Sequence, residues 1–189
     1  MNAKFIVIAG TRPLGLRTFD EMIRQVRVTG QKVVITREPG GTPLAENIRT
    51  MLNNRMADGD SGVIRKLIAA ARIHHEHNVI KPALAREEHV ICDSTGYTWL
   101  DTFSLSHEGS LIHEGFTREY LRGKPTMLVV LVSKSDNDHL KMIFRNLEET
   151  INTGFTPWET TVLYVDPKDP PALEQMLVAM KDHVTLQTA

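Results

Sequence analysis

The chain has 189 residues, of which 41% are hydrophobic and 24% charged, and its formal net charge is -1. These values predict one soluble globular domain with a single core, and the balanced charge argues against a nucleic-acid coat or an anionic-membrane surface. The single cysteine, Cys92, excludes an internal disulfide and favours the reducing cytoplasm. The first residues do not have the pattern of a secretory signal, and no apolar run approaches the roughly 18 residues of a membrane span.

The first half of the chain alternates short apolar runs with amphipathic stretches. The pattern predicts, in chain order, a strand at 4–9, a helix at 17–29, a strand at 32–36, a helix at 43–53, a long helix at 62–79 and a short helix at 82–87 that begins at Pro82. Helical spacing places Leu44 and Ile48 on the buried face of the fourth element, and Val63 and Leu67 on that of the fifth.

The second half continues the alternation. It predicts a strand at 89–92, a weakly periodic stretch at 94–116, a very apolar strand at 126–133, a helix at 136–152, a strand at 160–165 and a last helix at 170–184. Apolar strands alternating with helices indicate an α/β fold, a three-layer α/β/α arrangement around a five-stranded parallel sheet. Residues 1–189 are therefore expected to form one domain.

Ligands of such sheets gather at the carboxyl ends of the strands. Four connections are expected to meet there: Gly10–Arg17, Arg37–Gly41, Asp93–Thr95 and Ser133–Asp136. The crevice that they share is the predicted functional site.

The first of these connections has the frame of a phosphate-binding P-loop. Such a loop reads G-x-x-x-x-G-K-[ST] between a strand and a helix, and its backbone N–H groups, lysine and hydroxyl serve phosphate and Mg²⁺. Here Gly10 and Gly15 keep the frame, but Leu16 stands at the lysine position and Arg17 at the hydroxyl position, with Thr18 next. The helix N-terminus still attracts anions, so the expected phosphate-loop residues are Gly10, Gly15 and Thr18.

Two arginines in this loop offer replacement charge. Arg12 and Arg17 are predicted catalytic residues that would neutralise phosphate in place of the lysine. The alternative is that both are solvated surface arginines. The sequence leaves the two readings open.

The second connection resembles a family signature. Residues 36–49, T-R-E-P-G-G-T-P-L-A-E-N-I-R, are similar to the thymidylate kinase motif almost letter for letter, and L-I-A-A-A-R-I-H-H at 67–75 resembles that family's L-F-A-A-D-R-x-Q-H helix. Residues 79–93 resemble the stretch that leads into the family's D-R-[YF] motif. The resemblance is strong over 1–95, faint over 96–125 and topological beyond.

The resemblance implies a P-loop nucleoside monophosphate kinase that transfers the γ-phosphoryl group of ATP to dTMP with Mg²⁺, and that forms a homodimer. It implies a monophosphate site made of Arg37, Glu38, Pro39, Gly40, Arg49 and Arg72. It also implies that Asp93, which matches the aspartate of D-R-[YF], contributes to the phosphate and metal region. No nucleic-acid or membrane partner is implied.

Several positions depart from the family pattern. The acidic residue near the sugar falls at Arg12, the base-stacking phenylalanine at Ile68, and the arginine after the D-R aspartate at Ser94. The arginine-rich lid is expected to be reduced or absent near 134–146, where only three cations lie: Lys134, Lys141 and Arg145. The sequence thus supports two hypotheses: a divergent kinase with rebuilt charge, or a pseudo-kinase that binds a nucleotide or a protein through the retained fold.

The run His74-His75-Glu76-His77 is a further candidate, because His74 and His77 lie one turn apart. A Zn²⁺ site needs more ligands in register, so a polar helix surface is the favoured interpretation and no metal ligand is predicted. Cys92, inside a predicted buried strand, is expected to be inert.

Overall fold

The structure is a computed structural model that describes residues 3–10, 16–54, 61–94, 126–131, 161–166 and 168–185. The side chains of residues 16–19, 61, 65 and 94 are outside this description. The predicted helix at 136–152, the loop residues Arg12 and Gly15, and the lid region at 134–146 also lie outside the described residues.

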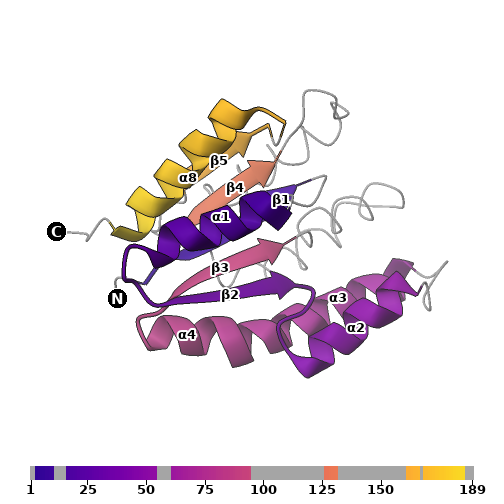
Figure 1. Ribbon diagram of the computed structural model, residues 1–189. Helices are drawn as coiled ribbons and strands as arrows, with labels where there is room; N and C mark the ends of the chain where they lie inside the picture. Colours follow the sequence, from indigo (N-terminus) through magenta and orange to yellow (C-terminus); the bar gives the residue numbers. More distant parts are fainter. Residues whose placement is uncertain are drawn as a thin grey trace.

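The described chain consists of short strands and of helices that lie on either side of them (Figure 1). In order they are β1 (Phe5–Gly10), α1 (Leu16–Arg27), β2 (Val33–Glu38), α2 (Pro43–Asn53), α3 (Ser61–His75), η1 (Glu76–Ile80), α4 (Lys81–Ala85), β3 (His89–Ser94), β4 (Met127–Leu131), β5 (Thr161–Val165) and α8 (Pro170–Thr185). Within the described helices, none is long and apolar enough to cross a membrane.

The strands form one five-stranded sheet in the order β2-β3-β1-β4-β5. Every pairing in it is parallel, which confirms the predicted fold class. β1 lies in the centre, between β3 and β4, so the connection after β1 leaves from the middle of the carboxyl edge. The ends of β1, β2 and β3 lie at the same edge, which gathers the predicted site residues there.

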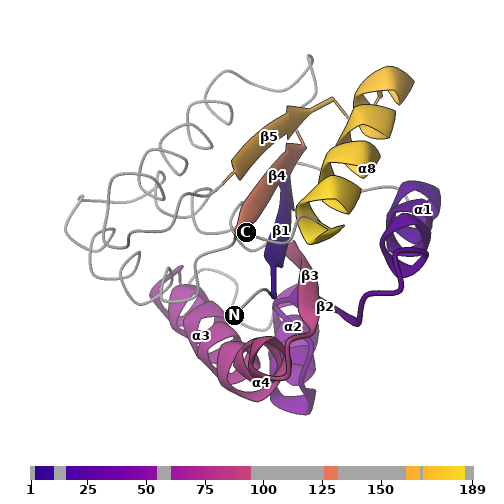
Figure 2. The ribbon, with the colours of Figure 1, turned by 90° about the vertical axis from the view of Figure 1, so that its left-hand side faces the viewer.

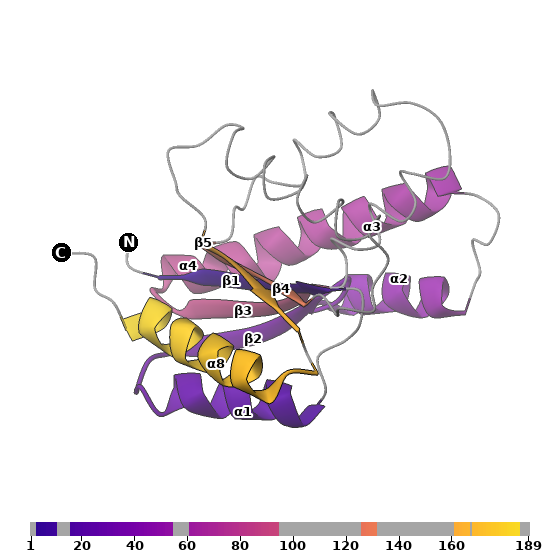
Figure 3. The same ribbon diagram turned by 90° about the horizontal axis from the view of Figure 1, so that it is seen from above.

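Helices cover both faces of the sheet (Figures 2 and 3). Alternate residues of a strand point to opposite faces. Phe5 and Val7 accordingly pack on one face with Ile80 of η1, while Ile6 packs on the other with Met22 of α1. The second face is completed by α8, whose Met176, Met180 and Val184 join the same cluster.

β2 and β3 are longer than the sequence predicts. Arg37 and Glu38 were expected in a loop, but they belong to β2, and Asp93 belongs to β3. The reason is pairing, because Arg37 lies opposite Asp93 and Glu38 opposite Ser94 in the parallel register. Pairing between β2 and β3 thus keeps these polar residues extended, and hydrophobic periodicity along one strand does not predict such pairing.

The predicted helix at 62–79 is interrupted. α3 ends at His75 and a π-helical turn, η1, follows, with the N–H of Lys81 donating to the carbonyl of Glu76. Pro82 has no N–H to donate, and its ring crowds the preceding turn. The wider π-helical turn therefore lies just before the proline, where a regular α-helix fits least well.

Two apolar side chains expected in the core are exposed. Leu44 is 47% exposed and Val63 is 43% exposed. α2 and α3 pack instead through Ala45, Ile48 and Ala71. The small alanines allow the two helices to approach closely, and this turns the larger neighbouring residues outward.

A polar cluster closes the amino edge of the sheet. The hydroxyl of Thr126 donates to the carbonyl of Phe5 at 3.0 Å and accepts the Phe5 N–H at 3.0 Å. The same hydroxyl lies 2.9 Å from Nε2 of His183. The N–H of Lys4 donates to Nδ1 of His89 at 3.0 Å. This cluster fastens α8 to β1 and β4.

Burial, followed by the nearby charges of Lys4 and His89, lowers the pKa of His183 to about 4. The unfolded chain takes up this proton near pH 6.5, so the free energy of unfolding should fall as the pH drops from about 6.5 to 4. We expect His183 to contribute about 1–2 kcal/mol to that loss, after allowance for solvent screening of a half-buried ring.

Chemical denaturation at pH 7.5, 5.5 and 4.5 measures this effect, with His183→Gln as the control. Glutamine has no titrating ring but keeps an amide donor for Thr126. The variant should lose less stability on acidification than the wild type. Equal losses in the two proteins would contradict the assignment.

Candidate functional site

The loop after β2 is built by the start of α2. Thr42 is the N-cap of α2, and its hydroxyl accepts the N–H of Ala45 at 3.1 Å. Pro43 follows at the first helical position, where its missing N–H costs nothing. Glu46 reaches back and its carboxylate accepts the N–H of Gly41 at 3.0 Å. The segment that bears the family signature is therefore fixed by its own side chains.

Glu46 also fixes an arginine. Nε of Arg37 donates to Oε1 of Glu46 at 3.0 Å and a terminal nitrogen donates to Oε2 at 2.8 Å. This two-point contact lowers the pKa of the Glu46 carboxyl. Both side chains are partly exposed, so the pair adds little to stability. Its effect is to orient Arg37 at the carboxyl edge of the sheet.

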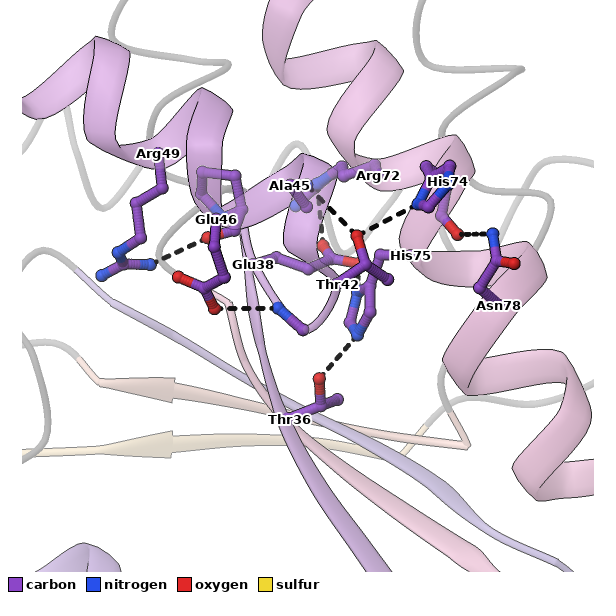
Figure 4. Close-up of polar contacts among 12 residues, drawn as sticks. Thr36, Glu38, Thr42, Ala45, Glu46, Arg49, Arg72, His74, His75 and Asn78 are labelled. Carbon is purple, nitrogen blue, oxygen red and sulfur yellow. Dashed lines mark hydrogen bonds and ion pairs between the residues drawn. The ribbon is translucent and has the colours of Figure 1, made fainter.

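A buried network joins the end of β2 to α3 (Figure 4). Oε2 of Glu38 forms an ion pair with Nε of Arg72 at 2.8 Å, and Oε1 lies 3.1 Å from Nδ1 of His75. Nε2 of His75 lies 2.6 Å from the hydroxyl of Thr36. His75 has no exposed surface, and the other three residues are at most 9% exposed.

α3 presents these groups because of helical spacing. Arg72 and His75 are three residues apart and share one helix face. His74, next in the chain, lies with its Nδ1 3.0 Å from the hydroxyl of Thr42. Consecutive histidines of α3 thus contact the strand end and the cap of α2.

A half-buried carboxyl lies between two arginines. Asp93 is opposite Arg37 in the sheet, and Arg49 of α2 donates to the carbonyl of Pro39 at 3.0 Å. Burial raises the pKa of Asp93, while the charges of Arg49 and Arg37 oppose that rise. Glu46 pairs with Arg37, so the two guanidinium groups are balanced by two carboxylates, and Arg49 is the one of the two arginines for which the described contacts show no carboxylate at hydrogen-bond distance. Its guanidinium group is therefore the better placed of the two to bind an anionic ligand.

One set of donors has the composition of a metal site. Ligand atoms of Glu38, His75 and Cys92 lie within 4.8 Å of one another. Both ring nitrogens of His75 already have hydrogen-bond contacts, and burial, followed by the charge of Glu38, raises the pKa of the Cys92 thiol. A metal requires a thiolate and a free ring nitrogen, so these atoms act as a hydrogen-bonding and packing group.

The six residues of the predicted monophosphate site lie in one region of the structure. The structure gathers Arg37, Glu38, Pro39, Gly40, Arg49, Arg72 and Asp93 around the ends of β2 and β3. Gly10 ends β1 at the same edge. Arg17 and Thr18 lie on α1 with side chains outside the description, and Arg12 and Gly15 lie outside the described residues.

Four residues that hold this site were not predicted as site residues, although they lie in the segments 36–49 and 67–75 that resemble the family, and His75 belongs to the histidine run considered as a metal candidate. They are Thr36, Thr42, Glu46 and His75. For Thr42 and Glu46 a signal exists, since T-P-x-x-E before an apolar face is a helix-start pattern. The contacts of Thr36 and His75 span 39 residues, and no local pattern indicates them.

Comparison with known proteins gives a consistent result. A family model described as "Thymidylate kinase" matches residues 18–98. The thymidylate kinases of two Pseudomonas syringae strains are 40% and 42% identical over 137 and 136 residues, which is 68% of this chain and 64% of each relative. The aligned part of the chain thus spans less than two thirds of the length of these relatives.

The solved thymidylate kinase of Ehrlichia chaffeensis superposes with a TM-score of 0.71. The match covers 94% of this chain and 96% of that one at 21% identity. At that identity, the likeness concerns the fold.

The close approach of the loop to His75 gives a stability prediction. Gly41 has φ +75°, and a Cβ there would lie 2.5 Å from both His75 Nε2 and Thr36 Oγ1. Gly30 has φ +76° and open space around it. Gly30→Ala should cost about 1 kcal/mol of unfolding free energy, for backbone strain alone, and Gly41→Ala roughly 2 kcal/mol more, for overpacking. Denaturant unfolding of both variants measures the difference, and equal costs would contradict the described packing.

Proposed function

Because the chain belongs to the thymidylate kinase family, we propose that it is a nucleoside monophosphate kinase that phosphorylates dTMP or a related deoxynucleoside monophosphate with ATP. One observation carries the proposal. Arg37 and Arg49 are held by specific contacts beside Asp93, and Arg72 is held by the Glu38 carboxylate at the end of the neighbouring strand β2. Fixed guanidinium groups are well suited to binding a phosphate, because they present paired donors in a rigid plane.

Phosphoryl transfer would require Mg²⁺ and ATP beside the carboxyl end of β1. Asp93 fits a metal region, since carboxylate oxygens are the ligands that Mg²⁺ prefers. The hydroxyl position of the P-loop pattern holds Arg17, and its lysine position holds Leu16. Arg12 and Arg17 are the residues that we propose as replacement charge, with Gly10, Gly15 and Thr18 as the phosphate loop.

The alternative is a pseudo-kinase, which is favoured by Leu16 and Arg17 at the lysine and hydroxyl positions of the P-loop pattern. An arginine finger contributes roughly 10³–10⁵ in rate in related chemistry, and here Leu16 and Ser94 replace two cations of the family pattern. In this alternative the chain binds a nucleotide or a protein and transfers nothing. For both the kinase and the pseudo-kinase, we propose that residues 1–189 form one domain whose lid is reduced near 134–146. We also propose a cytoplasmic location for both.

A homodimer is part of the proposal, as the family resemblance implies. Leu44 on α2 and Val63 and Ile73 on α3 are exposed apolar side chains on two helices that pack together. Sedimentation equilibrium of the purified chain tests the dimer, and a monomer at all concentrations would overturn it.

Calorimetry should show that the chain binds dTMP more tightly than Mg-ATP. The described monophosphate residues are fixed in place, whereas Leu16 and Arg17 remove the usual ATP contacts. Arg49→Gln should weaken dTMP binding by about 10–100-fold, the worth of a hydrogen bond to a charged group. Thymidine, which has no phosphate, is the matched control and should bind both proteins equally. Tight Mg-ATP binding without dTMP binding would overturn the proposal.

A coupled assay with dTMP and each other monophosphate then separates kinase from pseudo-kinase. Turnover by the wild type at about 1–100 s⁻¹ would establish the kinase and eliminate the alternative. dTMP binding without turnover, restored in the double variant Leu16→Lys/Arg17→Ser, would show that the P-loop positions are what stops catalysis. Binding without turnover in either protein would implicate Ser94 and the lid as well.

A further inference from the structure

Arg72 is held by a chain of buried contacts that crosses between two elements. The chain runs from the hydroxyl of Thr36 to Nε2 of His75 at 2.6 Å, from Nδ1 of His75 to Oε1 of Glu38 at 3.1 Å, and from Oε2 of Glu38 to Nε of Arg72 at 2.8 Å. Figure 4 shows the four side chains converging between β2 and α3. We refer to them as the Thr36–Arg72 relay.

The chemistry of the relay fixes where one proton lies. The carboxylate of Glu38 is paired with Arg72, so it is ionised and only accepts hydrogen bonds. Nδ1 of His75 must therefore carry a proton. The Thr36 hydroxyl then determines the orientation of the ring from the other side, because it is the contact of Nε2.

The relay leaves little freedom at its middle. Gly41 packs against His75 Nε2 and the Thr36 hydroxyl so closely that a Cβ would lie 2.5 Å from each. His75 is completely buried and has contacts at both ring nitrogens. Because the ring cannot turn, its Nδ1 stays in contact with one oxygen of Glu38. The other oxygen of Glu38 then stays paired with Arg72.

We propose that Thr36 and His75 are positioning residues for the nucleotide. They hold the Glu38 carboxylate, and through it they aim Arg72 at the bound monophosphate substrate. Neither residue contacts the ligand in this proposal. The inference rests on the proposed function, since it needs Arg72 to bind the deoxynucleoside monophosphate.

Thr36→Val and Thr36→Ser form a matched pair. Valine has the shape of threonine but no hydroxyl, so the ring of His75 loses one of its two fixed contacts. Thr36→Val should raise the dissociation constant of dTMP about fivefold, the worth of one hydrogen bond of roughly 1 kcal/mol. Thr36→Ser keeps the hydroxyl and should stay within about twofold of the wild type. Gly30→Ala is strained, but it lies before the start of β2, at the opposite end of the strand from Glu38, and has open space around it, so it should lose stability without losing dTMP affinity.

A second measurement does not depend on the ligand. Long-range ¹H–¹⁵N NMR of the wild-type chain reports which ring nitrogens of its 8 histidines carry protons, and the spectrum of His75→Asn identifies the signals of His75. The relay requires a protonated Nδ1 in the wild type. An unprotonated Nδ1 would overturn it, even if Thr36→Val failed to fold.

The outcomes separate the two proposals. Loss of affinity in Thr36→Val with retention in Thr36→Ser and Gly30→Ala supports the positioning role. A folded Thr36→Val that binds dTMP as tightly as the wild type overturns it and leaves the proposed function intact. A wild type that binds no deoxynucleoside monophosphate overturns both, and a protonated Nδ1 would then mark the relay as a structural clamp alone.

Discussion

The buried carboxylate of Glu38 is the constraint on which this half of the molecule depends. An ionised carboxyl that leaves water loses several kcal/mol of solvation, and only close, well-placed partners offset that loss. Glu38 lies at the end of β2, and its partners Arg72 and His75 come from α3. The need to satisfy one charge therefore fixes the position of α3 against the sheet.

The same constraint shapes the loop between β2 and α2. His75 occupies the space beside Gly41, so the loop passes where a side chain has no room. His74 contacts the hydroxyl that caps α2. The end of α3 thus holds both ends of the loop, and Glu46 holds its middle through Gly41 and Arg37. Rigid support of this kind is what a phosphate site needs, because guanidinium groups bind well only when they are already oriented.

Hydrophobic periodicity predicted the elements that depend on burial. The five strands and the bounds of α2 follow from apolar runs and from the proline that begins the helix. It failed where a distant partner decides the structure. β2 continues through Glu38 because β3 lies beside it, and Leu44 faces outward because two alanines bring α2 and α3 together.

The candidate site shows the same division. A local motif identified Arg37, Glu38 and Arg49, since their spacing is confined to one segment. It did not reveal that the carboxylate of Glu38 is turned to Arg72 and His75, because those partners lie 34 and 37 residues further along the chain. Spacing identifies which residues a loop offers, whereas their contacts depend on how two elements pack.

In the proposed function, monophosphate binding and phosphoryl transfer depend on different residues. This difference separates the kinase hypothesis from the pseudo-kinase hypothesis in physical terms. The buried network joins β2 to α3, whereas the positions that carry Leu16 and Arg17 lie at the start of α1, after β1. The described contacts of the network join β2, α2 and α3. These contacts do not depend on a lysine at position 16 or a hydroxyl at position 17, so selection for monophosphate binding alone could preserve the network while the phosphate loop changed. An ordered monophosphate side is thus expected in a divergent kinase and in a pseudo-kinase alike, so catalytic competence depends on the charge that residues around α1 and Asp93 present to the transferred phosphoryl group.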